Sequence, residues 1–178
     1  MNKTLTLQEI NTFKRERFVA ALASLFEGPP WIVEQAWQGR PFSSLADLHR
    51  ALCEVMMQAP AEQQVALIQA HPDLVGRASL AGTLTPASTS EQAAARLDRL
   101  SAEEIAAFTR YNQAYRERFG FPFVICAREN KKESILAGFA TRLQHSRDQE
   151  IKLALGEIAR ICWLRLQDTI RADGDNVQ

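Results

Sequence analysis

The sequence contains a single run with the composition of a β-strand, residues 121–127, which read Phe-Pro-Phe-Val-Ile-Cys-Ala. A strand needs a partner strand, and the sequence offers no second run of this kind. Pro122 also lacks the backbone N–H that a central strand would donate to its neighbour. The sequence therefore predicts that residues 121–127 form a buried extended connection in an all-α protein.

The rest of the chain has apolar residues at helical spacing, interrupted by glycine, proline and capping residues. We expect a bundle of about eight helices, over residues 13–26, 31–37, 44–59, 62–70, 91–100, 101–119, 132–146 and 148–171. Capping-box patterns occur at Thr6/Glu9 and at Ser101/Glu104. The first is expected to open only a short turn. One face of the helix over 101–119 is formed by Ile105, Phe108, Asn112, Tyr115 and Phe119, and Gly120 is expected to end it.

Length and charge limit the classes of protein that this chain can belong to. A chain of 178 residues can bury one sizeable core, so we predict a single helical domain over residues 1–178, with about residues 173–178 as a flexible tail. Lysine plus arginine equals aspartate plus glutamate, 21 each, which gives no basic field for nucleic acid. No run of about 18 apolar residues could cross a membrane. The three scattered cysteines indicate reduced thiols in a cytoplasmic protein.

His71 stands where a helix must end, because Pro72 disfavours helical geometry in the residue before it. The helix dipole favours a protonated imidazole at a helix C-terminus, and a histidine can exchange a proton near neutral pH. A purely structural role, in which His71 caps the last carbonyl groups, is the alternative. Residues 72–90 follow without clear periodicity, and such a long irregular segment inside a domain is often functional.

Residues 88–92, Ser-Thr-Ser-Glu-Gln, offer a second group of candidates. Ser88 and Glu91 fit a capping box at a helix start. A carboxylate beside His71 would instead orient the imidazole and raise its pKa, as in acid–base pairs. Gln92 carries an amide suited to a urea-like or carbonyl group, and backbone N–H groups at the helix start could bind an anion.

The arginines and the other histidines are ambiguous. Arg128 directly follows the apolar run. Arg165 lies at the edge of an apolar helical stripe, where it could reach solvent, pair with a buried acid or bind a ligand carboxylate. His49 and His145 sit beside arginines and are expected to be solvated. No third ligand accompanies His71 and Asp73 at a metal-binding spacing, so no metal site is predicted.

Three motifs occur in one order: residues 71–74 (His-Pro-Asp-Leu), residues 88–92, and residues 119–123 (Phe-Gly-Phe-Pro-Phe) continuing to Arg128. In this combination the chain resembles the 2-oxo-4-hydroxy-4-carboxy-5-ureidoimidazoline (OHCU) decarboxylase family, from about residue 5 to residue 170. One departure is the pair Gly28-Pro29, where many relatives have His-Ser. The chain also ends without a peroxisomal tripeptide, so it is more similar to bacterial, cytoplasmic members.

The resemblance implies an all-helical homodimer that needs no cofactor and converts OHCU to (S)-allantoin and carbon dioxide, the last step of urate breakdown. It implies that His71 is catalytic and Glu91 its acidic partner, which also contacts the substrate. The other substrate contacts that it implies are Pro72, Ser88, Thr89, Ser90, Gln92, Phe123, Val124, Ile125, Cys126, Ala127 and Arg165. Two alternatives remain: a hydrolase of ureides that uses His71 and Glu91 to activate water, and an all-α interaction module without catalysis.

Overall fold

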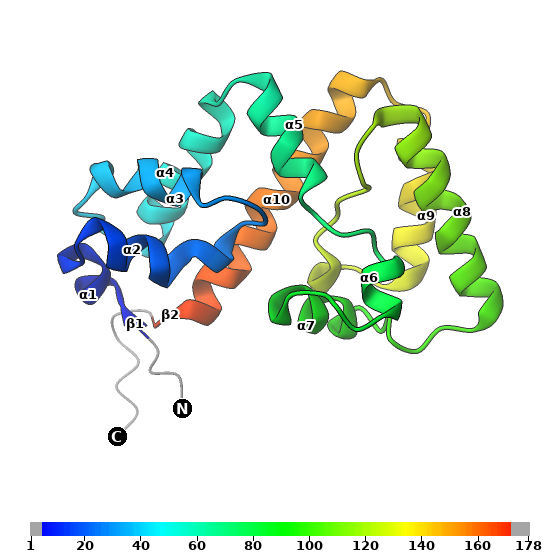
Figure 1. The fold of residues 1–178 in the computed structure, drawn as a ribbon, viewed down its shortest axis with the longest axis horizontal. Helices are drawn as coiled ribbons and strands as arrows, with labels where there is room; N and C mark the ends of the chain where they lie inside the picture. The colour runs from blue at the N-terminus through cyan, green and yellow to red at the C-terminus, as the bar shows by residue number, and fades with distance from the viewer. Residues whose placement is uncertain (1–4, 172–178) are drawn as a thin grey trace. The chain divides into compact units, whose positions relative to one another are not determined.

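The computed structural model describes residues 5–171 and confirms the all-α class (Figure 1). Helices α1 to α10 span Leu7–Thr12, Arg15–Leu22, Trp31–Ala36, Leu45–Gln58, Ala61–Gln69, Arg77–Leu80, Pro86–Ala94, Ala102–Phe119, Lys132–Arg142 and Arg147–Thr169. Short 3₁₀ helices η1, η2 and η3 span Ala23–Leu25, Trp37–Gly39 and Ala127–Glu129. Compared with the eight expected helices, α6 is additional, and α1 is a helix rather than a short turn. The predicted tail over residues 173–178 lies outside the described residues.

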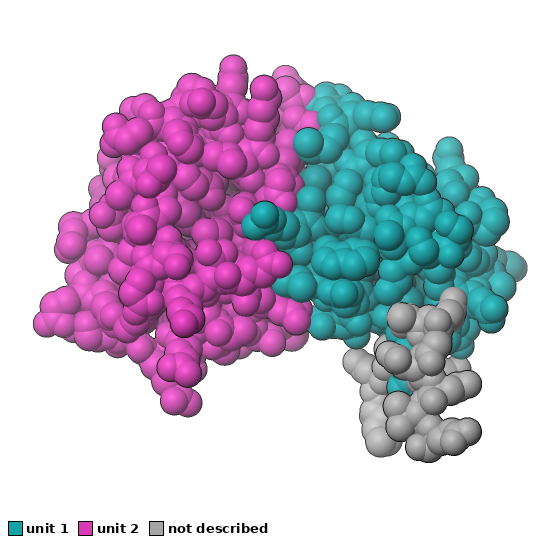
Figure 2. Space-filling view, turned by 180° about the vertical axis from the view of Figure 1, so that it is seen from behind, with its two compact units in different colours: residues 1–60, 159–178 teal, residues 61–158 magenta. Residues whose placement is uncertain are grey.

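The chain forms two compact units, coloured separately in Figure 2. Unit 1 comprises the described residues of 1–60 and 159–178, and unit 2 comprises residues 61–158. Helix α10 contributes its first half to unit 2 and its second half to unit 1. Each unit has its own buried apolar side chains. The single-domain organisation stays a prediction.

Helix α1 of unit 1 begins at a capping box that the sequence predicted. The Glu9 backbone N–H donates to Thr6 Oγ1 over 3.2 Å, and the Thr6 N–H donates to the Glu9 carboxylate over 2.9 Å. Strands β1 (Leu5–Thr6) and β2 (Ile170–Arg171) pair in parallel, which the sequence did not predict. Two-residue strands are too short to leave a period-two pattern. The unit's core includes Phe18, Leu22, Ile32, Leu48, Leu52, Cys162 and Leu166.

Unit 2 contains the predicted buried connection. Helix α8 ends at Gly120 in the left-handed conformation, with φ of 80°, as expected for a glycine C-cap. The chain then runs extended and largely buried through residues 121–126. Phe123 stacks on Phe139 of α9 with ring centroids 3.9 Å apart, and lies edge-on to Tyr115 of α8. The connection is therefore part of the core, beside α8 and α9, which pack against each other.

The segment between residues 72 and 100 differs from the prediction. Residues 72–90, expected to be irregular, contain α6 and the first turns of α7. Thr85 caps α7 by accepting the Ser88 backbone N–H over 3.2 Å, and Pro86 occupies the first turn. The predicted Ser88/Glu91 capping box is therefore wrong, because the helix begins earlier. The helix expected over 91–100 is also wrong, since α7 ends at Ala94 and Arg96 adopts a φ of 59°.

Candidate active site

His71 lies just beyond the C-terminal end of α5 and is 7% exposed. Its backbone N–H donates to the Ile68 carbonyl, and its Nδ1 lies 2.9 Å from the Leu67 carbonyl oxygen. A carbonyl oxygen only accepts hydrogen bonds, so Nδ1 must carry the proton. The neutral imidazole then has its lone pair on Nε2, which is the atom able to take a proton from a substrate.

The residues after His71 form a loop, residues 71–76, which we call the His71 loop. Val75 has a φ of 52°, in the left-handed region that β-branched residues avoid. Its backbone N–H donates over 3.1 Å to the Gln92 side-chain oxygen, and Gln92 is buried on α7. This contact joins the first predicted motif to the second. It also occupies the side-chain oxygen of Gln92, whose amide was predicted to contact the substrate.

Helix α8 holds the same loop through residues that the sequence analysis did not assign to the site. The Asn112 amide donates over 2.8 Å to the Leu74 carbonyl oxygen, and Arg116 Nε donates over 2.9 Å to the Asp73 carboxylate. Asn112 Oδ1 is buried and forms no hydrogen bond with any described residue. Such an unsatisfied group costs about 1–3 kcal/mol. A polar residue on the apolar face of α8 was the sequence signal that could have identified Asn112.

Helix α7 brings the second motif against the third. It packs on η3, which follows the extended connection. Glu91 is partly buried on α7, and its charge contributes to raising the pKa of Cys126. Ser88 is buried, whereas Thr89 and Ser90 are exposed. All three motifs therefore meet within unit 2.

Several backbone groups of the extended connection are already used by the protein. The Val124 carbonyl accepts from Arg142 Nη1 over 2.7 Å, and the Cys126 N–H donates to the Glu157 carboxylate over 2.8 Å. Among the contacts within residues 5–171, no hydrogen bond is found for the Ile125 backbone. Phe123 and Ala127 are buried, and Arg128 is exposed on η3.

The Cys126 side chain is a neutral thiol. Burial is the largest cause that raises its pKa, to about 11, and the carboxylates of Glu129, Glu157 and Glu91 add to the effect. The reactive form of a cysteine is the thiolate. The structure therefore gives Cys126 no nucleophilic role near neutral pH.

A buried polar cluster around Glu150 is linked to the extended connection through Arg142. Glu150 is fully buried and accepts from Arg142 Nε over 2.8 Å and from the Tyr115 hydroxyl. His145 Nδ1 lies 2.8 Å from the other Glu150 oxygen, so the expectation that His145 is solvated is wrong. The expectation for His49 is wrong as well, because its Nε2 lies 2.8 Å from the Ala159 carbonyl oxygen. These partners are distant in sequence or lie beyond a helix end, which periodicity does not reveal.

Arg165 belongs to unit 1, whereas the other predicted site residues belong to unit 2. It is buried, and it donates over 3.0 Å to the Glu27 carboxylate and over 3.1 Å to the Ser24 carbonyl oxygen. Of the alternatives that the sequence left open for Arg165, the structure shows the pairing with a buried acid.

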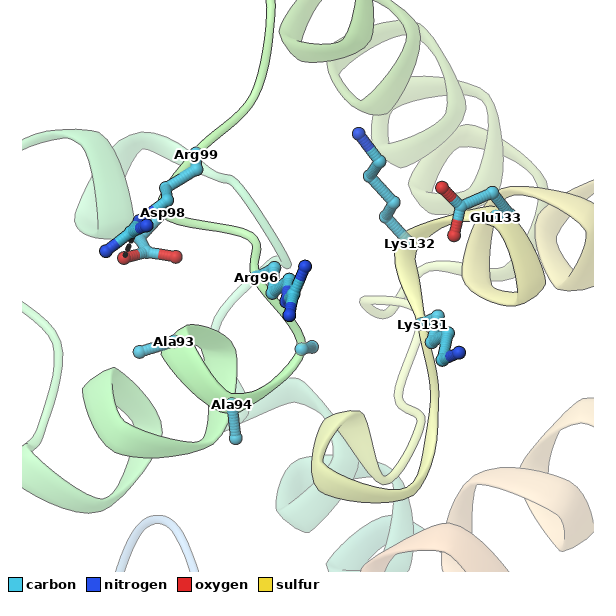
Figure 3. A pocket seen from close by; sticks show the side chains of 9 residues that line it. Ala93, Ala94, Arg96, Asp98, Arg99, Lys131, Lys132 and Glu133 are labelled. Atoms are coloured by element: carbon cyan, nitrogen blue, oxygen red, sulfur yellow. Dashed lines mark ion pairs between the residues drawn. The ribbon is translucent and has the colours of Figure 1, made fainter.

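A separate cavity of about 730 Å³ lies between the end of α7 and the start of α9 (Figure 3). Arg96 projects from one side, and Lys131 and Lys132 lie on the other. Its described lining contains none of the predicted site residues. Within residues 5–171, no three His, Cys, Asp or Glu side chains are grouped to hold a metal ion, and no helix is long and apolar enough to span a membrane.

Comparisons with known proteins agree with the three motifs. The family model "OHCU decarboxylase" matches residues 11–167. The OHCU decarboxylase of Haloferax volcanii is 40% identical over 169 residues, covering 95% of this chain and 98% of that protein. The corresponding protein of Amia calva is 41% identical over 167 residues, covering 94% and 95%.

Solved structures share the fold. A crystal structure of (S)-allantoin synthase matches 93% of this chain and 54% of that chain, with a TM-score of 0.75 and 24% identity. A crystal structure of OHCU decarboxylase in the presence of (S)-allantoin matches 88% of this chain and 97% of that chain, with a TM-score of 0.67 and 21% identity. The family model and the two relatives, each covering nearly the whole chain, show that this protein belongs to the OHCU decarboxylase family.

Proposed function

We infer that this protein decarboxylates OHCU to (S)-allantoin, and that His71 and Glu91 form its acid–base pair. The observation that carries the assignment of His71 is its contact with Leu67, which puts the lone pair of the neutral ring on Nε2. The meeting of α7, which bears Glu91, with the His71 loop and with η3 supports a site in this region.

The substrate supplies its own electron sink. Its C4 carries both the carboxylate and the hydroxyl group, next to the C=N bond at C5. When the bond from C4 to the carboxylate breaks, carbon dioxide leaves. The electron pair then forms a C4=C5 double bond, while the ring nitrogen takes up a proton. A carbonyl forms at C4 as the hydroxyl proton departs and C5 gains a proton. The protein has to bind and orient the substrate and to move protons.

In the proposed mechanism, His71 Nε2 accepts the proton of the C4 hydroxyl group, and the negative charge of Glu91 stabilises the imidazolium that results. Addition of a proton to only one face of C5 gives one enantiomer. In free solution both faces are open, so spontaneous decay yields racemic allantoin. A single enantiomer is therefore the signature of catalysis in an enclosed site.

The remaining contacts are proposed from the arrangement around α7. The Gln92 amide nitrogen is available as a donor once its oxygen is held by Val75. Ile125 offers backbone groups for the amide-like edge of the substrate. Pro72, Ser88, Thr89, Ser90 and the rest of residues 123–127 complete the proposed contacts in unit 2. Arg165 is the proposed contact for the carboxylate or a carbonyl, with Glu27 fixing its guanidinium.

We also propose that the protein acts as a cytoplasmic homodimer. The family resemblance supports this proposal. Light scattering of the purified protein tests the dimer, with the mass of two chains as the expected result and the mass of a single chain as the contradiction.

Product analysis tests the reaction. OHCU generated freshly from urate is mixed with the protein, and carbon dioxide, ammonia and circular dichroism are followed. Equimolar carbon dioxide with a growing (S)-allantoin signal is expected. Ammonia or ring opening without carbon dioxide would instead establish a ureide hydrolase. Racemic allantoin at the spontaneous rate would favour the interaction module.

A further inference from the structure

Asn112 is a buried residue whose side-chain nitrogen, but not its side-chain oxygen, is hydrogen-bonded within residues 5–171. It is 7% exposed, and its amide nitrogen donates over 2.8 Å to the Leu74 carbonyl oxygen. Its Oδ1 has no hydrogen-bond partner among the described residues. The assignment of nitrogen and oxygen is fixed by chemistry, because only the amide nitrogen can donate to a carbonyl oxygen. An apolar side chain of similar shape would avoid the unsatisfied oxygen but would leave the Leu74 carbonyl without this donor.

The contact is placed where it can act on His71. Leu74 immediately precedes Val75, whose φ of 52° is strained. The Gln92 side-chain oxygen accepts the Val75 N–H, and the Asn112 amide donates to the Leu74 carbonyl oxygen. Side chains of α7 and α8 therefore hydrogen-bond to both polar groups of the Leu74–Val75 peptide unit. Strained backbone of this kind persists only where the surroundings over-determine it, and it gathers at functional sites.

We propose that Asn112 is a positioning residue for His71. Its amide holds the His71 loop in the conformation that keeps Nδ1 of His71 on the Leu67 carbonyl and Nε2 toward the reacting hydroxyl group. Asn112 does not touch the substrate in this role. The catalytic part of the proposal rests on the proposed decarboxylation, whereas the effect on the imidazole is independent of it.

The decisive variant is Asn112→Leu, which keeps the branched four-atom outline of the side chain and removes the donor. We expect a folded protein whose kcat falls ~10- to 100-fold while KM changes little, because small misplacements of a catalytic group carry losses of this size. A long-range ¹H–¹⁵N spectrum of the imidazoles reports the tautomer directly, and the chain has only three histidines. The wild type should show His71 protonated at Nδ1, and the variant a mixture with the Nε2–H form.

Asn112→Asp keeps the shape and makes the donor depend on pH. A protonated carboxyl can donate to the Leu74 carbonyl, whereas an ionised one repels it. Burial raises the pKa of a carboxyl group, so the kcat of this variant relative to wild type should rise as the pH falls. This variant decides the question if Asn112→Leu does not fold.

Gln113→Leu is the matched control. Gln113 is the next residue on α8, is exposed, and donates its amide to Glu117 over 2.9 Å rather than to the His71 loop. Its variant should keep the wild-type kcat and tautomer. The positioning role would be overturned by a wild-type tautomer and kcat in Asn112→Leu. It would also be overturned if the kcat of Asn112→Asp relative to wild type did not depend on pH. An inactive wild type whose tautomer still shifts in Asn112→Leu would overturn the proposed function and leave the positioning intact.

Discussion

The imidazole of His71 reaches back along its own helix, and its Nδ1 lies 2.9 Å from the carbonyl oxygen of Leu67. This is the helix-capping contact that a structural interpretation of His71 predicts. The same contact determines which nitrogen carries the proton, and it leaves Nε2 as the basic atom. The capping contact uses Nδ1, and the proposed catalysis uses the other ring nitrogen, Nε2, so the two roles do not compete.

Glu91→Gln removes the charge proposed to stabilise the His71 imidazolium and keeps the shape of the side chain. We expect kcat to fall ~10²-fold, at the lower end of the effect of acid–base groups. Steady-state kinetics on OHCU measures it. Glu103→Gln, in the exposed first turn of α8, is the control and should behave as wild type. An unchanged kcat in Glu91→Gln would remove Glu91 from the mechanism.

Glu150→Gln should destabilise the fold strongly. Glu150 is fully buried, and the variant leaves the nearly buried Arg142 cation beside a neutral amide. Breaking a buried pair in this way costs about 3–5 kcal/mol. Urea unfolding gives the change in the free energy of unfolding.

A surface pair provides the comparison for Glu150. Arg50 and Glu54 form an ion pair over 3.1 Å with side chains 65% and 54% exposed. Glu54→Gln should change the free energy of unfolding by about 0–1 kcal/mol. Similar losses in the Glu150 and Glu54 variants would contradict the structural importance of the buried cluster.

The thiols should be inert near neutral pH. Burial is the main cause that raises the pKa of Cys53 and of Cys126 to about 11, and it also raises the pKa of Cys162. Because alkylation requires the thiolate, brief treatment with iodoacetamide should leave both the mass and the turnover of the native protein unchanged. Rapid modification of Cys126 with loss of activity would contradict this account.

Tyr115 should titrate only in strongly alkaline solution. Burial is the first cause that raises its pKa, and its hydrogen bond to Glu150 is the second. The resulting stabilisation is fully present below the ordinary tyrosine pKa of about 10 and is lost as the pH rises through the folded value. The chain has two tyrosines, so the tyrosinate absorbance of wild type minus that of Tyr115→Phe isolates this group. Ionisation of Tyr115 near pH ~10 in the native protein would contradict its placement.

Local signals in the sequence predicted much of the fold. The capping boxes at Thr6 and Ser101 and the C-cap at Gly120 depend on residues within one turn of each other, and all three are confirmed. The start of α7 was missed although Thr85-Pro86 is itself a helix-start signal, because the capping-box pattern at Ser88 competes with it. The buried connection was predicted because proline and the lack of a partner strand excluded a sheet.

Contacts between distant residues were not predictable in the same way. Asn112 and Leu74 are 38 residues apart, and Arg165 and Glu27 are 138 residues apart. Periodicity shows that such a polar residue lies on an apolar face, but it does not show which partner the fold brings to it. The family resemblance supplied the proposed roles of His71 and Glu91, and the structure added the groups that hold the His71 loop.

The most direct test of the central claim compares wild type with His71→Asn. The asparagine amide can replace Nδ1 as the donor to Leu67, but it has no counterpart of Nε2. The initial rate of growth of the (S)-allantoin circular dichroism signal should fall about 10²–10⁴-fold, with thermal unfolding close to wild type. A His71→Asn variant that is folded and still produces (S)-allantoin at the wild-type rate would contradict the account.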